Sequence, residues 1–108
     1  TVTYYGDTLK SGANSIAAAT ISGDADGTPG SAQFALGVTV TGTGSASSGY
    51  ETGSNNYNFV VNTVSTVASA TGPVSSDSIA MRYIANIPAS QAAGSYSTSL
   101  ELVGTANF

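Results

Sequence analysis

The sequence contains no cysteine, no histidine and no tryptophan, and only eight of its 108 residues are charged. Without histidine and cysteine, the chain lacks the most common general base, the most common metal ligands and the thiol nucleophile. Serine is abundant, but a serine nucleophile needs a base, and no histidine is there to act as one. These absences argue against catalysis, and we predict that the protein is not an enzyme.

Positive charge is also scarce, because Lys10 and Arg82 are the only basic residues and the net charge is −4. Two cations cannot neutralise several phosphates or dock on an anionic lipid surface, so we expect no nucleic-acid partner. No apolar run approaches the ~20 residues of a membrane-spanning helix, so we expect no membrane insertion. The surface is instead rich in Gly, Ser, Thr and Ala, which favours an extracellular or cell-surface location in a prokaryote. Weak charge also leaves little repulsion between copies of the chain.

Alternating apolar residues predict β-strands separated by Gly, Ser, Asn and Pro clusters. The expected strands cover residues 1–9, 15–22, 33–41, 57–67, 78–87 and 96–108, with a long polar loop over residues 42–56. No window carries a sustained helical period. We therefore expect one all-β domain spanning residues 1–108, an antiparallel β-sandwich of immunoglobulin-like or jelly-roll type.

Six strands are one fewer than the roughly seven of an immunoglobulin-like sandwich, and a missing strand leaves a groove with unpaired backbone groups. A strand from a neighbouring subunit can fill such a groove. The terminal residues 1–10 are the candidate donor strand, carrying Val2 and Tyr4. The candidate groove residues are apolar positions of two other strands: Phe34, Leu36, Val38, Leu100 and Leu102. The alternative is that the first strand pairs within its own chain and that these are core residues.

The best candidate metal ligands are Asp24 and Asp26, which flank Ala25 and precede Gly27. Two carboxylates on a tight loop suit calcium, although the late bidentate glutamate of an EF-hand is missing. The alternative is an ordinary acidic turn. We expect no other cofactor.

Lys10 and Asn107 are residue types that form a covalent cross-link between an early and the last strand in some surface sandwiches, so such a bond is one hypothesis. The chemistry needs a buried lysine, and Lys10 adjoins a Ser-Gly turn instead. Tyr50 and Tyr57 flank the polar loop and form a candidate sugar-stacking surface. The alternative for both rings is core packing.

Residues 87–102 read IPASQAAGSYSTSLEL, in which Pro88 ends one strand, Gly94 permits a bend and Tyr96 restarts the alternation. This segment resembles the closing segment of spore-coat-U/Csu-type pilins and of WxL-like surface domains. The cysteines common in Csu-type domains and the tryptophan that defines WxL are missing here. The resemblance implies an exported β-sandwich and points toward a pilus subunit.

The sequence therefore favours a structural subunit of an extracellular filament, whose partners are copies of itself joined by strand exchange. Two alternatives remain open. One is a monomeric adhesion module that binds host or surface glycans, and the other is a spacer domain of a larger surface protein.

Overall fold

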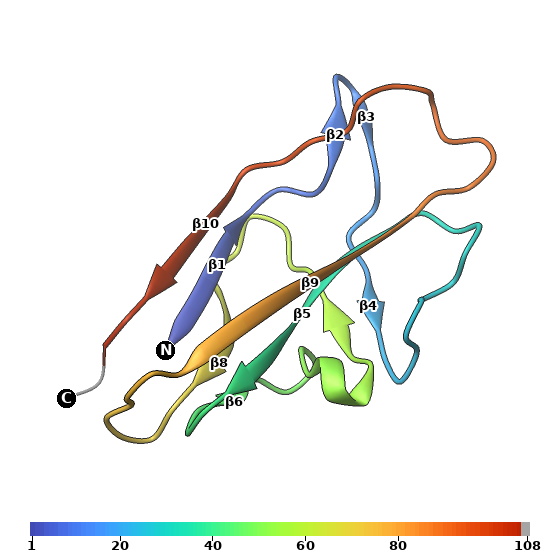
Figure 1. Ribbon diagram of the computed structural model, residues 1–108. Helices are drawn as coiled ribbons and strands as arrows, with labels where there is room; N and C mark the ends of the chain where they lie inside the picture. Colours follow the sequence, from blue (N-terminus) through green and yellow to red (C-terminus); the bar gives the residue numbers. More distant parts are fainter. Residues whose placement is uncertain (107–108) are drawn as a thin grey trace.

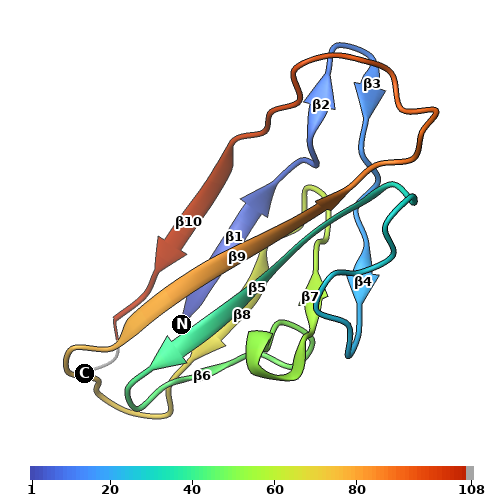
Figure 2. The ribbon, with the colours of Figure 1, turned by 45° about the vertical axis from the view of Figure 1, so that its right-hand side comes forward.

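The computed structural model describes residues 1–106, and it contains two four-stranded sheets and a small hairpin (Figures 1 and 2). The first sheet has the order β10-β1-β8-β6, and the second has the order β4-β7-β5-β9. The strands of the first sheet are β1 (Val2–Gly6), β6 (Ser45–Ala46), β8 (Ser65–Ser69) and β10 (Leu100–Gly104). Those of the second sheet are β4 (Thr20–Ile21), β5 (Gln33–Thr41), β7 (Tyr57–Asn58) and β9 (Ser78–Asn86).

The hairpin consists of β2 (Lys10–Ser11) and β3 (Asn14–Ser15), and a short 3₁₀ helix, η1, covers Thr52–Ser54. Every pair of adjacent strands within the described sheets is antiparallel. The expected all-β antiparallel sandwich is thereby confirmed.

The core lies between the sheets and is organised by the alternation of β5. Phe34, Leu36 and Val38 point into it, and each is at most 4% exposed. Opposite them lie aromatic and aliphatic side chains of the first sheet and the loops: Tyr4, Tyr50, Phe59 and Val67. The ring centroids of Phe34 and Phe59 are 4.9 Å apart, and those of Tyr4 and Phe59 are 5.3 Å apart. Aromatic side chains thus fill a space that a disulfide helps to secure in many sandwiches of this size.

The other face of β5 is also buried in the first half of the strand, at Ala35 and Gly37, while Thr39 and Thr41 further along it are exposed. Ala35 packs there with Ile21, Tyr57 and Ile84 in a second, smaller cluster. Gly37 allows the polypeptide to pass close by, since a Cβ at this position would lie 2.7 Å from Cδ1 of Tyr57. The longest strand pair, β5 with β9, runs in register from Gln33–Asn86 to Thr41–Ser78 and forms the backbone of the second sheet.

The structure corrects several expected boundaries. The strand expected over residues 57–67 is two strands, β7 and β8, which belong to different sheets. Between them the chain turns at Asn62, which adopts a left-handed conformation with φ of 50°. The loop expected over residues 42–56 contains β6 and η1. The last strand covers Leu100–Gly104 within the longer range that was expected, residues 96–108.

Candidate interaction edge

One side of the sandwich is open between β9 and β10. In the described part of the chain, β9 pairs only with β5 and β10 pairs only with β1, so each is the outer strand of its sheet. Both strands lie on the same side of the molecule, on opposite layers (Figures 1 and 2). Each therefore presents a row of backbone N–H and C=O groups to the exterior, which is the kind of edge that accepts a further strand.

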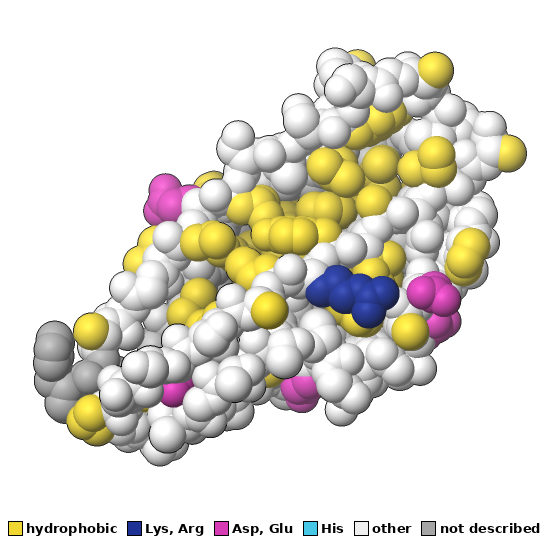
Figure 3. Space-filling view, in the orientation of Figure 1, with side chains coloured by type: hydrophobic (Ala, Val, Ile, Leu, Met, Phe, Trp, Pro, Cys, Tyr) yellow, Lys and Arg dark blue, Asp and Glu magenta, His cyan; other side chains and the backbone are white. Residues whose placement is uncertain are grey.

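A groove of about 590 Å³ lies between the two edge strands. Its lining is mostly apolar and comes from both layers: Leu9, Phe34, Tyr83, Ala85, Ser97, Thr98, Leu100 and Leu102. The space-filling view shows it as a hollow with hydrophobic side chains along its floor and walls (Figure 3). Tyr83 is 46% exposed and Leu102 is 51% exposed, so large apolar groups meet solvent here. Contiguous apolar surface of this kind marks an interaction site in many soluble proteins.

Three of the predicted groove residues line this groove, namely Phe34, Leu100 and Leu102. Phe34 forms part of the floor, and its ring stacks on Tyr83 at an interplanar angle of 8°. The other two predicted groove residues do not reach it. Leu36 and Val38 are 0% and 1% exposed and belong to the closed core, as in the alternative interpretation of these positions.

The predicted donor strand does not extend from the molecule. In the structure β1 pairs with β10 on one side and with β8 on the other, within its own chain. Tyr4 is 1% exposed, and its hydroxyl group shares a hydrogen bond of 3.0 Å with that of Tyr50. Val2 is half-buried and packs against the same core. As in the alternative, Val2 and Tyr4 complete the sandwich of the chain to which they belong.

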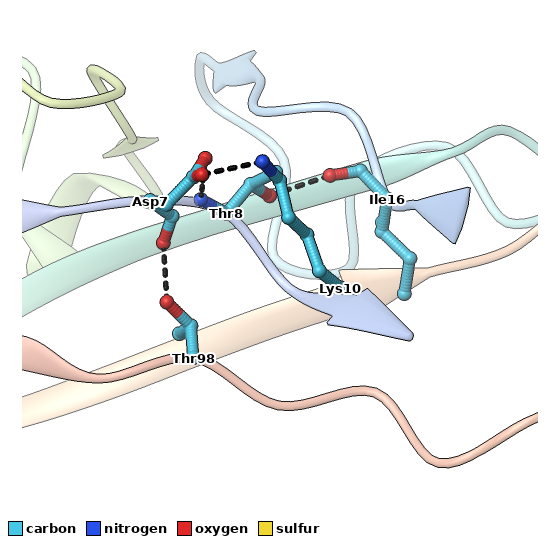
Figure 4. Close-up of polar contacts among 5 residues, drawn as sticks. All are labelled: Asp7, Thr8, Lys10, Ile16 and Thr98. Carbon is cyan, nitrogen blue, oxygen red and sulfur yellow. Dashed lines mark hydrogen bonds and ion pairs between the residues drawn. The ribbon is translucent and has the colours of Figure 1, made fainter. Parts of the chain in front are cut away.

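The segment after β1 is anchored rather than flexible (Figure 4). The Asp7 carboxylate forms an ion pair of 2.5 Å with Lys10 Nζ and accepts a hydrogen bond from the Thr8 N–H. The hydrogen bond from Lys10, and then that from Thr8, lower the pKa of Asp7. The Thr98 hydroxyl donates to the Asp7 carbonyl oxygen at 2.6 Å, and the Thr8 hydroxyl donates to the Ile16 carbonyl oxygen at 2.5 Å. The exit of β1 is therefore held by three separate segments.

Lys10, the candidate for a covalent cross-link, is half-exposed, and its Nζ forms the ion pair with the Asp7 carboxylate. Its backbone pairs with Ser97, through hydrogen bonds of 3.0 and 2.9 Å. Asn107, the other candidate, lies outside the described residues. The cross-link between these residues stays a prediction.

Asp24 and Asp26 lie in an exposed turn after β4. The Asp24 carboxylate accepts a hydrogen bond from the Asp26 N–H at 3.1 Å, which is the geometry of an Asx turn. Among residues 1–106, no group of three or more acidic, histidine or cysteine side chains gathers at one place. Calcium binding here stays a prediction, and a melting temperature that rises with added calcium would support it.

The sugar-stacking surface expected at the polar loop is not available, because Tyr50 is 6% exposed and Tyr57 is 0% exposed. Both rings are packed against other side chains, as in the alternative interpretation: Tyr50 lies in the core between the sheets, and Tyr57 lies in the smaller cluster on the other face of β5. The loop between them is ordered by Glu51, whose carboxylate accepts hydrogen bonds from the Gly49 N–H and from Asn56 Nδ2. Backbone and side-chain hydrogen bonds lower the pKa of this carboxyl group.

Sequence reasoning missed Tyr83, the most exposed aromatic residue of the groove. The signal was present, since Tyr83 alternates with Ile79 and Met81 on one face of β9. Sequence reasoning did not reveal that β9 would be an edge strand.

Comparison of the chain with protein-family models, with curated proteins and with solved structures gave no match. Within the described residues, no helix has the length and apolar character needed to cross a membrane.

Proposed function

We propose that this chain is a structural, non-catalytic subunit of an extracellular or cell-surface assembly of pilus-like filament type. It joins its neighbour by β-strand addition at the open side. The observation that carries the proposal is the apolar groove between the edge strands β9 and β10, each of which has one side without a neighbouring strand. Backbone groups of the edges would supply hydrogen bonds to an added strand, and the groove would receive its alternate side chains.

The chemistry of the chain agrees with this role. Hydroxyl-rich, weakly charged surfaces oppose self-association only slightly, and eight charged residues in 108 is a small number for a soluble domain. The closing segment's resemblance to pilin-like domains points in the same direction. Because β1 is held within its own sheet, the added strand comes from another part of the neighbouring subunit than residues 1–9.

The test is the assembly state of the purified chain, by light-scattering mass and negative-stain electron microscopy of the same sample. Species well above the monomer mass of 10.6 kDa are expected at high protein concentration, with regular filaments as the end state. Leu102→Lys places a charge at an exposed position of the groove, where it does not disturb the closed core, and should reduce the species to monomer.

Val64→Lys is the matched control, because Val64 is 68% exposed and is not part of the groove lining. This variant should assemble like the original chain. Two results would contradict the proposal and favour a spacer or monomeric adhesion module. One is a chain that stays monomeric at high concentration, and the other is assembly that Leu102→Lys does not change.

A further inference from the structure

The two edge strands carry opposite charges, Arg82 in the middle of β9 and Glu101 near the start of β10. Arg82 is exposed in the middle of β9, and its guanidinium group lies 5.7 Å from the ring centroid of Tyr57 on the outer face of the sheet. Glu101 is exposed on β10, opposite Tyr5 of β1, and also on the outer face. In the described part of the chain the only ion pair joins Lys10 and Asp7, so both of these charges lack an ionic partner.

The edges are also complementary in direction. β9 and β10 run in opposite directions along the open side (Figures 1 and 2). A two-fold rotation about an axis along the groove preserves strand direction and exchanges the two layers. It therefore sets β9 of one copy antiparallel to β10 of a second copy, and forms the same contact again on the opposite layer. A surface of this kind is self-complementary, as a two-fold interface requires.

The charges define a register that also suits the apolar side chains. If Arg82 lies opposite Glu101 of the second copy, then Met81 lies opposite Leu102 and Tyr83 lies opposite Leu100. Met81 and Tyr83 face the interior of the sandwich, as do Leu100 and Leu102. Opposite charges thus meet on the outer face while four large apolar groups meet over the groove. A shift by one residue would turn apolar side chains against polar ones.

We propose that two copies of this chain associate through their open sides, with β9 of each adding antiparallel to β10 of the other in the Arg82–Glu101 register. This inference rests on the proposed function and names its partner as a second copy. Because a two-fold contact closes on itself, the pair is the building unit of the assembly, and growth into a filament uses a contact outside the open side. Each four-stranded sheet then continues into the opposite sheet of the second copy, giving two sheets of eight strands. The pair covers both apolar grooves and leaves neither long edge unpaired.

Charge reversal tests the register in solution. Arg82→Glu and Glu101→Arg should each raise the dissociation constant of the pair by about tenfold or more, since each places like charges opposite one another twice. An equimolar mixture of the two variants restores opposite charges at both contacts, and should associate like the original chain. The double variant should do the same. Thermal melting of each charge-reversed variant, compared with that of Arg82→Gln and Glu101→Gln, shows whether the chain still folds. A charge-reversed variant that melts like its neutral counterpart has lost association and not folding.

Cysteine pairs test the same register covalently, because the chain has no cysteine of its own. Met81→Cys and Leu102→Cys should form a disulfide-linked dimer when mixed under mild oxidation, and neither variant should do so alone. As a control for chance collision, Met81→Cys mixed with Val64→Cys should stay unlinked.

The outcomes separate this inference from the proposed function. Assembly that is lost in Leu102→Lys but unchanged by both charge reversals would overturn the register. Strand addition at the open side would still hold, but a segment other than β9 or β10 would occupy the groove. A chain that never associates would overturn both. Recovery of association in the charge-reversed mixture supports the Arg82–Glu101 contact between copies, because pairing within one chain cannot produce it, and a mass of two chains for the recovered species supports the two-fold pair.

Discussion

At the scale of single residues, two buried tyrosines differ in what their hydroxyl groups contact. The Tyr4 hydroxyl shares a hydrogen bond with Tyr50 and accepts one from the Val60 N–H at 2.9 Å. The Tyr57 hydroxyl is equally buried and has no hydrogen-bond partner in the described part of the chain. The first hydroxyl joins three segments, while the second carries the desolvation cost of a polar group with no compensating bond.

We expect Tyr4→Phe and Tyr57→Phe to change stability in different directions. Tyr4→Phe leaves the Val60 N–H without its acceptor and should lower the free energy of unfolding by about 1–3 kcal/mol. Tyr57→Phe removes an unsatisfied group and should leave the free energy of unfolding unchanged or raise it. Urea unfolding of the two variants measures the difference. Equal destabilisation by both would contradict the assignment of their contacts.

Asp77 makes stability depend on pH. Its carboxylate accepts hydrogen bonds from the backbone N–H groups of Thr43 at 2.9 Å and Gly44 at 2.8 Å, and these bonds lower its pKa. A lowered folded-state pKa contributes stability above the unfolded value of about 4, and this stability is lost as the pH falls through the folded value. The loop between β5 and β6 should therefore loosen in acid.

The test compares Asp77→Asn with the original chain from pH 6 to pH 2, by urea midpoint. The variant should lose less stability on acidification, because the asparagine does not titrate. Asp26→Asn is the matched control, since no hydrogen bond to the Asp26 carboxylate is present in the described residues, and its pH profile should follow that of the original chain. A profile for Asp77→Asn that matches the control would contradict the role of Asp77.

At the scale of elements, the sequence predicted best the strands that alternate over their whole length. β5 covers Gln33–Thr41, as the alternation of Phe34, Leu36 and Val38 indicated, and β9 ends one residue before its expected boundary. The prediction was less accurate where valines occur without a strand. Val60, Val61 and Val64 suggested a continuous strand, but they are 38%, 38% and 68% exposed around a turn. β-Branched residues fit strands generally, and only tertiary contacts decide where the chain bends.

The candidate site could be predicted only in part, because alternation shows which residues face inward but not which of them line a groove. Alternation identified Phe34, Leu100 and Leu102 as inward-facing, and all three line the groove. Alternation alone could not separate them from Leu36 and Val38, because a core position and a groove position show the same pattern. The difference depends on which strand is an edge, and strand order is not encoded in local spacing.

β1 is the element whose removal should matter most, since it is central in its sheet and contributes Tyr4 to the core. A chain that lacks residues 1–9 leaves β8 and β10 without their common partner, and we expect it to show no cooperative thermal unfolding. Addition of a peptide of residues 1–9 should restore a cooperative transition, and the same peptide with Tyr4→Asp should not. Cooperative melting of the shortened chain by itself would show that β1 is dispensable.

At the scale of the whole molecule, the elongated sandwich measures 49 × 26 × 18 Å, and an apolar groove lies along its open side. Association that covers this side stabilises the folded state by mass action. The melting temperature should therefore rise with protein concentration over the range in which pairs form. For Leu102→Lys it should be independent of concentration, and scanning calorimetry across a hundredfold dilution distinguishes the two. A melting temperature that is constant for both would contradict association through this side.

The pairing of Thr1 with Thr105 has a mechanical consequence. Thr1 and Thr105 exchange hydrogen bonds at one end of the antiparallel pair β1–β10. A pulling force applied between these two residues acts across the strands rather than along them. The backbone hydrogen bonds between β1 and β10 therefore break one after another. A domain loaded in this way yields at low force. In the proposed pair, a load along the strands passes between the two copies through the long edges, where the hydrogen bonds are loaded in shear together.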